Sequence, residues 1–361
     1  MSERPTTDEI VAHFREQAEF CRELGSRFTA ELCEAMAADI EAGGPAAMLV
    51  RDWPSNPRRD ALSLRLAGYL HHSVLTGAAR DLSALYPGQD ADWSMTKVWP
   101  VARSWLADTP DATLAFMQSP PQTNEVRRAI ALLPGLLHLA AAHPRPMHLL
   151  ELGASAGLNQ NLDRFDYRTG SWTRPGGSGV LIDTDWIGAP PENLDGALHV
   201  VSRAACDQNP IDITDPGSAL RLKSYVWPDQ PERLARISAA IALAVQTGVT
   251  VDRADAADWL KAKLASRPSS GLTVVYHSVF LQYPPADVRR SLLETLAKEG
   301  AAATAERPLA WLCFEPAAFF QGPEQAGISP NAFITYLKVW PGGVEKRFLR
   351  SDGHVTRVSV I

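Results

Sequence analysis

The sequence has few cysteines, and their spacing does not suggest a shared site. The four cysteines among 361 residues form no C-x-x-C pair. This excludes a disulfide-rich scaffold and a cysteine-based zinc site, and we expect reduced thiols. The histidines also match no H-E-x-x-H or Cys/His ligand spacing, so we predict no metal site.

Long apolar runs are also missing. The longest, AIALLPGLLHLAAA at residues 129–142, is too short to span a bilayer and is interrupted by Pro134, Gly135 and His138. The first residues, MSERPTTDE, are polar and do not resemble a signal peptide. We therefore expect a soluble, cytoplasmic protein that has no membrane partner.

Charge of one sign is not concentrated in the sequence. The formal net charge is -6 and the basic pairs are scattered, which argues against binding of extended nucleic acid. We expect a small-molecule or protein substrate instead, and the oligomeric state stays open. The hydrophobic share of 45% is ample for a packed interior, and 361 residues exceed what one core usually supports. Two domains, or one domain with a large appendage, are therefore expected.

The first 146 residues show helical periodicity throughout. Thr6 and Glu9 have the spacing of a capping box, and apolar residues then recur at helical intervals. From residue 147 onward, strand-like and helix-like segments alternate, which indicates a mostly parallel sheet covered on both faces. We predict an all-helical domain over residues 1–146 and an α/β domain over residues 147–361, with an insertion at about 166–196.

The expected strands of the α/β domain are short apolar runs bounded by turn residues. They are MHLLEL, GVLIDTDW, ALHVVSRA, VTVDRA, LTVVYHSVF, PLAWLCFEP, FITYLKVW and HVTRVSVI. No helical segment separates the last two, which are joined through PGG and SDG turns. We therefore expect these two strands to pair antiparallel.

The segment LLELGASAGLNQNLDRF, at residues 149–165, carries the clearest functional signal. A strand ends in Glu151, a loop contains Gly153, Ser155 and Gly157, and a helix is expected to follow. Ligands of open α/β sheets bind at the carboxyl ends of the strands, where a glycine loop gives them access to backbone N–H groups. A tight turn that binds no ligand is the alternative.

Three ligand-binding interpretations compete for this loop. A dinucleotide fingerprint fits poorly, because Ser155 occupies the second of its glycine positions and the third also lacks glycine. GASAG also matches the G-x-S-x-G nucleophile elbow, which would make Ser155 the nucleophile of a serine hydrolase with His277 or His354 as its base. That fold places strands before the elbow, whereas the preceding residues look helical. The third interpretation is an E-x-G-x-x-x-G loop.

That loop resembles the first motif of the S-adenosylmethionine-dependent methyltransferases, in which Glu151, Gly153, Ser155 and Gly157 would cradle the methionine end of the cofactor. The methyltransferase sheet also ends in an antiparallel strand pair. Further segments are similar to a bacterial family of unknown function that is assigned to this fold. They are QTNEVRR, ELGASAGLNQNLDRFDYR, CDQNPID, YVWPDQPER, DAADWL and YHSVFLQY.

The resemblance implies a doubly wound sheet of the methyltransferase-like Rossmann type and S-adenosylmethionine as cofactor. It implies an enzyme that transfers a methyl group to an unidentified small-molecule or protein acceptor. Because a fold does not determine function, two alternatives remain: a serine hydrolase using Ser155, and a non-catalytic binding protein of the same fold.

The resemblance also suggests which acids bind the nucleoside part of the cofactor. Asp207 would bind the ribose hydroxyls, with Asp183 and Asp185 as competing candidates. Asp255 would accept a hydrogen bond from the adenine amino group, and the Ala256 backbone N–H would donate one to the ring. For Asp255 the structural alternative is a helix N-cap, and the two roles are compatible.

Candidate catalytic residues follow from the same comparison. His277 and Ser278 would lie near the methyl group, with His277 as general base and Ser278 in the cofactor site; a purely structural histidine is the alternative. HSVF departs from the N-P-P-[FY] motif of enzymes that methylate planar amides or bases. Glu125 would close the pocket or serve only as a first-turn acid. Asn159 follows the glycine loop and is a further cofactor-binding candidate.

Overall fold

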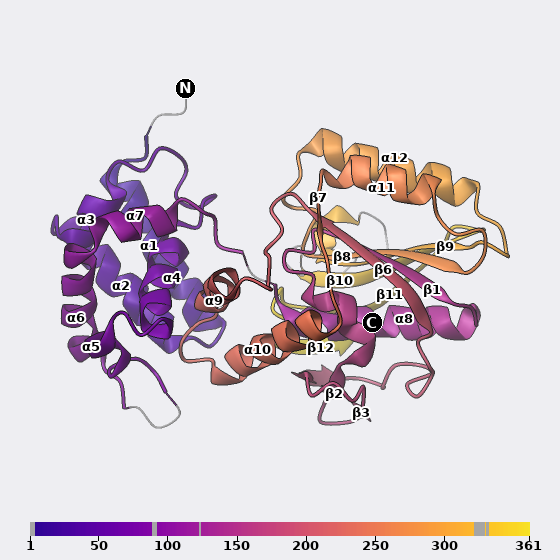
Figure 1. Ribbon diagram of the computed structural model, residues 1–361, viewed down its shortest axis with the longest axis horizontal. Coiled ribbons are helices and arrows are strands. Elements are labelled where there is room, and N and C mark those ends of the chain that lie inside the picture. Colours follow the sequence, from indigo (N-terminus) through magenta and orange to yellow (C-terminus); the bar gives the residue numbers. More distant parts are fainter. Residues whose placement is uncertain (1–3, 89–91, 123, 321–328, 330–331) are drawn as a thin grey trace. The chain divides into compact units, whose positions relative to one another are not determined.

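The computed structural model describes residues 4–88, 92–122, 124–320, 329 and 332–361. The chain divides into two units (Figure 1). A helical unit contains the described residues of Met1–Thr123 together with Thr214–Ser238, and an α/β unit contains Asn124–Ile213 together with the described residues of Ala239–Ile361. No helix in these described ranges is long and apolar enough to cross a membrane.

The helical unit is built around apolar faces of α1, α2 and α4, whose side chains form one buried cluster that includes Phe14, Phe28 and Leu66. Its elements are α1 (Thr7–Glu23), α2 (Arg27–Glu41), α3 (Pro45–Val50), α4 (Leu62–Leu75), α5 (Arg80–Ser83), α6 (Met95–Asp108), α7 (Pro110–Met117), α9 (Pro216–Ser224) and the start of α10 (Pro231–Gln246). The predicted capping box is confirmed, because Thr6 and Glu9 each accept the other's backbone N–H.

Residues 214–238 belong to the helical unit, although the sequence suggested the α/β domain. Asp229 holds the start of α2 by accepting hydrogen bonds from Ser26 Oγ (2.6 Å) and from the Phe28 N–H (2.8 Å). His71 Nδ1 of α4 lies 3.1 Å from the Ser224 carbonyl oxygen at the end of α9. Such contacts join residues about 150 to 200 positions apart, which helical periodicity cannot reveal.

The α/β unit contains a nine-stranded sheet with the order β5-β12-β11-β10-β9-β8-β1-β6-β7. Its strands are β1 (Met147–Leu152), β5 (Asp185–Ile187), β6 (Val200–Asp207), β7 (Asp252–Arg253), β8 (Leu272–Ser278), β9 (Leu309–Pro316), β10 (Phe333–Trp340), β11 (Val344–Ser351) and β12 (Arg357–Val360). The neighbouring strands β9, β8, β1, β6 and β7 are parallel to one another. The predicted α/β class with a mostly parallel sheet is confirmed.

The strand order reverses next to β1. The chain passes from β1 to β6 and β7 on one side, and then returns to β8 and β9 on the other. The carboxyl ends of β1 and β8 therefore border a topological switch point, where open α/β sheets bind ligands.

The carboxyl-terminal strands form a three-stranded antiparallel meander, not the expected pair. The prediction that residues 333–340 pair with the last strand is wrong, because β11 lies between β10 and β12. The PGG turn leads directly into β11, and the SDG turn follows that strand. The insertion forms a small sheet from β2 (Asp166–Arg168), β3 (Thr173–Arg174) and β4 (Leu181–Asp183), and β5 then joins the main sheet beside β12.

Helices cover both faces of the main sheet (Figure 1). Helices α11 (Ala256–Ala265) and α12 (Ala286–Ala301) pack together on one face, and α8 (Ala129–Ala142) contacts β9, β10 and β11 on the other. Helix α8 is apolar on nearly all sides, and ten of its residues are buried, so it packs as a core helix of the α/β unit. The α/β unit therefore begins before α8, at residue 124, and not at the expected boundary near residue 146.

Candidate functional site

The glycine loop follows β1 at the switch point and has an unusual backbone. Gly153, Ser155 and Gly157 have φ angles of 64°, 54° and 71°, in the left-handed region. A Cβ atom at Gly153 would overlap the Phe280 ring, and one at Gly157 would lie 2.6 Å from Gln160 Nε2. The left-handed backbone therefore favours glycine at both positions, and at Gly153 the Phe280 ring also leaves no room for a side chain.

The segment after the loop is the 3-10 helix η2 (Leu158–Arg164), which is kinked at Asn161, and not the expected regular helix. Its amide side chains are used for contacts outside the segment. Asn159 Nδ2 donates to the Glu125 carbonyl oxygen (3.3 Å), and Asn161 Nδ2 donates to Thr247 Oγ1 (2.8 Å). The short, kinked segment provides no regular helix dipole to stabilise a pyrophosphate, so the geometry does not favour the dinucleotide interpretation.

Glu151 is an acid buried beneath the glycine loop. Its side chain accepts a hydrogen bond from the Tyr276 hydroxyl (3.1 Å). Burial raises the pKa of Glu151 to about 8, the Tyr276 hydrogen bond opposes this rise, and the nearby charge of Asp207 adds to it. Glu151 is therefore a buried acid beneath the loop whose pKa lies near neutral pH.

Asp207 is the candidate ribose-binding acid that lies at the glycine loop. One carboxylate oxygen accepts the Ser155 backbone N–H (2.8 Å), and the other accepts the Asn209 N–H (2.8 Å). The competing acids lie elsewhere. Asp183 of β4 pairs with Arg168 in the small sheet, and Asp185 is in β5, at the edge of the main sheet opposite β7.

Asp255 and Ala256 follow β7, the strand next to β6. Asp255 is the N-cap of α11 and accepts the backbone N–H groups of Ala257 (2.9 Å) and Asp258 (3.3 Å). The capping interpretation is confirmed. Ala256 is the buried first residue of the helix. Their predicted contacts with adenine stay predictions.

His277 is buried in a hydrogen-bonded network on the α11–α12 side of the sheet. Its Nε2 accepts a hydrogen bond from Trp311 Nε1 (2.9 Å), and its Nδ1 lies 2.6 Å from Glu315. Indole N–H only donates, so Nε2 is unprotonated and Nδ1 donates its proton to Glu315. Both ring nitrogens are engaged, and this geometry favours the structural alternative over a general base. Ser278 ends β8 and is half-buried.

Two buried polar atoms at the loop have no hydrogen-bond partner among the described residues. They are Ser155 Oγ and Asn159 Oδ1, on side chains that are 9% and 2% exposed. Buried polar atoms are normally paired, because leaving one unpaired costs about 1–3 kcal/mol. A ligand that carries hydrogen-bond donors would satisfy both.

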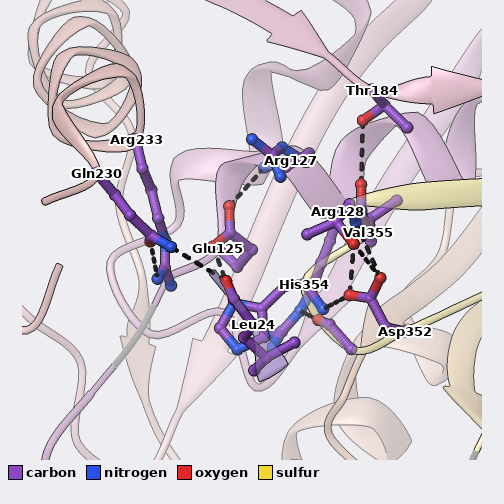
Figure 2. Close-up of polar contacts among 12 residues, drawn as sticks. Leu24, Glu125, Arg127, Arg128, Thr184, Gln230, Arg233, Asp352, His354 and Val355 are labelled. Carbon is purple, nitrogen blue, oxygen red and sulfur yellow. Dashed lines mark hydrogen bonds and ion pairs between the residues drawn. The ribbon is translucent and has the colours of Figure 1, made fainter. Parts of the chain in front are cut away.

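Glu125 is buried just before the short helix η1 (Val126–Arg128) and accepts the Arg127 backbone N–H (3.1 Å). Its Oε2 lies 3.8 Å from Nδ1 of His354, in the loop between β11 and β12 (Figure 2). The sequence pointed to Glu125 but suggested no partner for it. His354 was considered only as a hydrolase base, and 229 positions separate the two residues, so no local pattern connects them.

One family of known sequences matches the chain. A family model described as "Uncharacterized protein conserved in bacteria (DUF2332)" covers residues 11–359. No curated protein and no solved structure matches the chain. Because the family model covers nearly all of its length, the chain belongs to DUF2332, a bacterial family of unknown function.

Proposed function

We propose that the protein binds S-adenosylmethionine at the glycine loop and transfers its methyl group to a small-molecule or protein acceptor. The proposal includes a sheet of the methyltransferase-like Rossmann type. The observation that carries it is the glycine loop at the switch point, with Glu151 beneath the loop and Asp207 bonded to its backbone. The unpaired Ser155 Oγ and Asn159 Oδ1 add two acceptors for a ligand's donor groups.

The charge around the loop supports this ligand over a dinucleotide. Asp207 ends β6 and Asp255 follows the neighbouring parallel strand β7, so two acidic groups lie at one edge. Such a site repels a pyrophosphate but suits a ligand with an ammonium group, a sulfonium and ribose hydroxyls. The loop residues would hold the methionine end, Asp207 the ribose, and Asp255 with Ala256 the adenine.

The bound cofactor would supply an activated methyl group. The protein would contribute mainly by position, because alignment of acceptor, methyl carbon and sulfur converts a bimolecular step into an effectively unimolecular one. Because they have no side chain, Gly153 and Gly157 would let the ligand approach the backbone closely.

Calorimetry and thermal unfolding with S-adenosylmethionine and S-adenosylhomocysteine test the proposal. Ligand at 100 times its dissociation constant should stabilise the protein by about 2.7 kcal/mol. Asp207→Ala should weaken binding about 10- to 100-fold, the equivalent of a lost charged hydrogen bond. The matched controls Asp183→Ala and Asp185→Ala should bind as the wild type does. Absence of binding to either compound at millimolar concentration would overturn the proposal.

A serine hydrolase is the second candidate, because Ser155 has the left-handed backbone of a strained turn (φ 54°), as a nucleophile elbow requires. Ser155 Oγ has no hydrogen-bond partner in the described part of the chain, so no histidine activates it in this structure. A fluorophosphonate probe should leave the wild type and Ser155→Ala equally unlabelled. Labelling that Ser155→Ala abolishes would establish the hydrolase instead.

A further inference from the structure

Four described residues that carry side chains adopt left-handed backbone conformations in loops of the α/β unit, and one of them is Asn193, between β5 and β6. Ser155 follows β1, Val279 follows β8, and Val355 lies between β11 and β12, with φ angles of 54°, 52° and 57°. Two of them are β-branched, for which this conformation is a genuine outlier. Such residues cost about 1–3 kcal/mol each and cluster at functional sites.

The β11–β12 loop lies at the same edge of the sheet as the glycine loop. At this edge Ser278 of β8 pairs with Phe314, near the carboxyl end of β9. Pro316, the last residue of β9, pairs with Phe333, which in turn pairs with Ser351 at the end of β11. The residues after Ser351 therefore emerge at the carboxyl edge of the parallel strands, where ligands of such sheets bind.

The loop is built to hold His354 in one place (Figure 2). Asp352 Oδ1 accepts the His354 backbone N–H (2.7 Å). Thr184 Oγ1 donates to the Val355 carbonyl oxygen (3.1 Å), and Arg128 Nε donates to the carbonyl oxygen that precedes His354 (3.0 Å). These contacts hold the strained Val355 and fix the backbone on both sides of the histidine.

Glu125 connects this histidine to the glycine loop. Its carboxylate is 3% exposed and lies 3.8 Å from His354 Nδ1, while the His354 side chain is 23% exposed. The Glu125 carbonyl oxygen accepts from Asn159 Nδ2 (3.3 Å), and Asn124 Oδ1 accepts the Leu158 N–H (3.0 Å). The dipeptide Asn124–Glu125 thus contacts both the exit of the loop and the histidine.

We propose that His354, positioned by Glu125, is the base that takes the proton from the methyl acceptor. The proposal rests on the function proposed above. The acceptor heteroatom would form its bond to the methyl carbon as the carbon–sulfur bond breaks, and the electron pair of the broken bond would go to sulfur. The acceptor proton would pass to His354. The buried Glu125 carboxylate then stabilises the imidazolium. His277 cannot take this role while Trp311 and Glu315 occupy its nitrogens.

Carbethoxylation of histidines tests the location of His354 without any acceptor. The protein is treated with diethyl pyrocarbonate, and the modified histidines are quantified by mass spectrometry with and without S-adenosylhomocysteine. At about ten times the dissociation constant, the ligand should slow modification of His354 about tenfold, since roughly one tenth of the protein stays free. His148 is the internal control, because it lies at the amino end of β1 and its rate should not change.

Ligand binding tests the proposed function, whereas protection of His354 tests the role of this histidine. If calorimetry shows no binding of S-adenosylhomocysteine, the proposed function fails. If the ligand binds but His354 reacts equally fast with and without it, the role of His354 is overturned while the proposed function stands.

Methyl transfer from tritiated S-adenosylmethionine into a bacterial metabolite extract gives the second measurement. His354→Gln should lower transfer about 10²- to 10⁴-fold, the usual contribution of a general base, with the dissociation constant of S-adenosylhomocysteine unchanged. Glu125→Gln should lower transfer less and change its pH profile, because Glu125 acts through His354. Transfer at the wild-type rate by His354→Gln would overturn the proposal, and where the wild type transfers no label, the protection experiment decides.

Discussion

Tyr276 and Glu151 face each other on the adjacent parallel strands β8 and β1, and the Tyr276 hydroxyl donates a hydrogen bond to Glu151 Oε2 over 3.1 Å. Both side chains are buried. Because burial raises the pKa of Glu151 to about 8, the carboxyl group is largely protonated at neutral pH. The titratable carboxyl group of Glu151 thus lies directly beneath the glycine loop.

Glu151→Gln should change how stability depends on pH. The pKa of Glu151 rises from 4.5 to about 8 on folding, so the folded state binds more protons than the unfolded state between these values. Stability from this residue is therefore lost as pH rises through that window, by at most about 1.4 kcal/mol per pH unit. Urea unfolding should show that the free energy of unfolding of the variant, relative to that of the wild type, increases with pH between 4.5 and about 8. Above this window the difference should stay constant. Parallel curves, as expected for the exposed Glu294→Gln, would contradict the prediction.

Gly153→Ala should destabilise the α/β unit more than Gly248→Ala. Both glycines have a left-handed backbone, which costs an L-residue about 1–2 kcal/mol, but only Gly153 faces a side chain, the Phe280 ring. Overpacking should add about 1–3 kcal/mol. Chemical denaturation measures both variants, and the added Phe280→Ala should remove part of the difference. Equal losses for the two glycines would show that Phe280 moves away freely.

His277→Ala should destabilise the protein strongly and leave S-adenosylhomocysteine binding intact in the folded fraction. Glu315 is fully buried, and removal of its partner leaves a buried acid partly uncompensated, which costs about 3–5 kcal/mol. Trp311→Phe removes only the second hydrogen bond of the ring and should cost about 1 kcal/mol for that bond. A stable His277→Ala variant would favour a catalytic role for this histidine after all.

Asp229→Ala should destabilise the helical unit. Asp229 accepts from Ser26 Oγ and from the Phe28 N–H, and the neighbouring Gln230 Nε2 donates to the Leu24 carbonyl oxygen over 3.3 Å (Figure 2). Loss of the two Asp229 contacts should cost about 2–3 kcal/mol. The exposed N-cap variant Asp215→Ala should cost about 1 kcal/mol or less. Equal small losses, measured by urea unfolding, would show that Asp229 is not needed to hold α2.

The features that could be predicted from the sequence are local ones. The capping box of Thr6 and Glu9, the strand before the glycine loop and the N-cap at Asp255 each depend on residues within a few positions of one another. The glycine loop was recognisable from the spacing of Glu151, Gly153 and Gly157 after a strand-like run, and both glycines have a left-handed backbone. Asp207 could be proposed, but only the strand order separates it from Asp183 and Asp185.

The features that could not be predicted depend on distant parts of the chain. The apolar helix α8 gives no sign of which core it enters, because all its sides are apolar. The two nitrogen partners of His277 come from β9, a strand more than 30 positions later. The pairing of Glu125 with His354 requires β12 to return along β11, and that arrangement follows from the whole sheet.

The return of residues 214–238 to the helical unit affects the order in which the protein can fold during synthesis. The amino-terminal helices leave the ribosome first, but Asp229 and α9, which complete their contacts, are made only after β1 and β6. At ~5–20 residues per second, the unit stays incomplete for several seconds. A fragment that ends near residue 123 therefore lacks residues 214–238, which belong to the same unit.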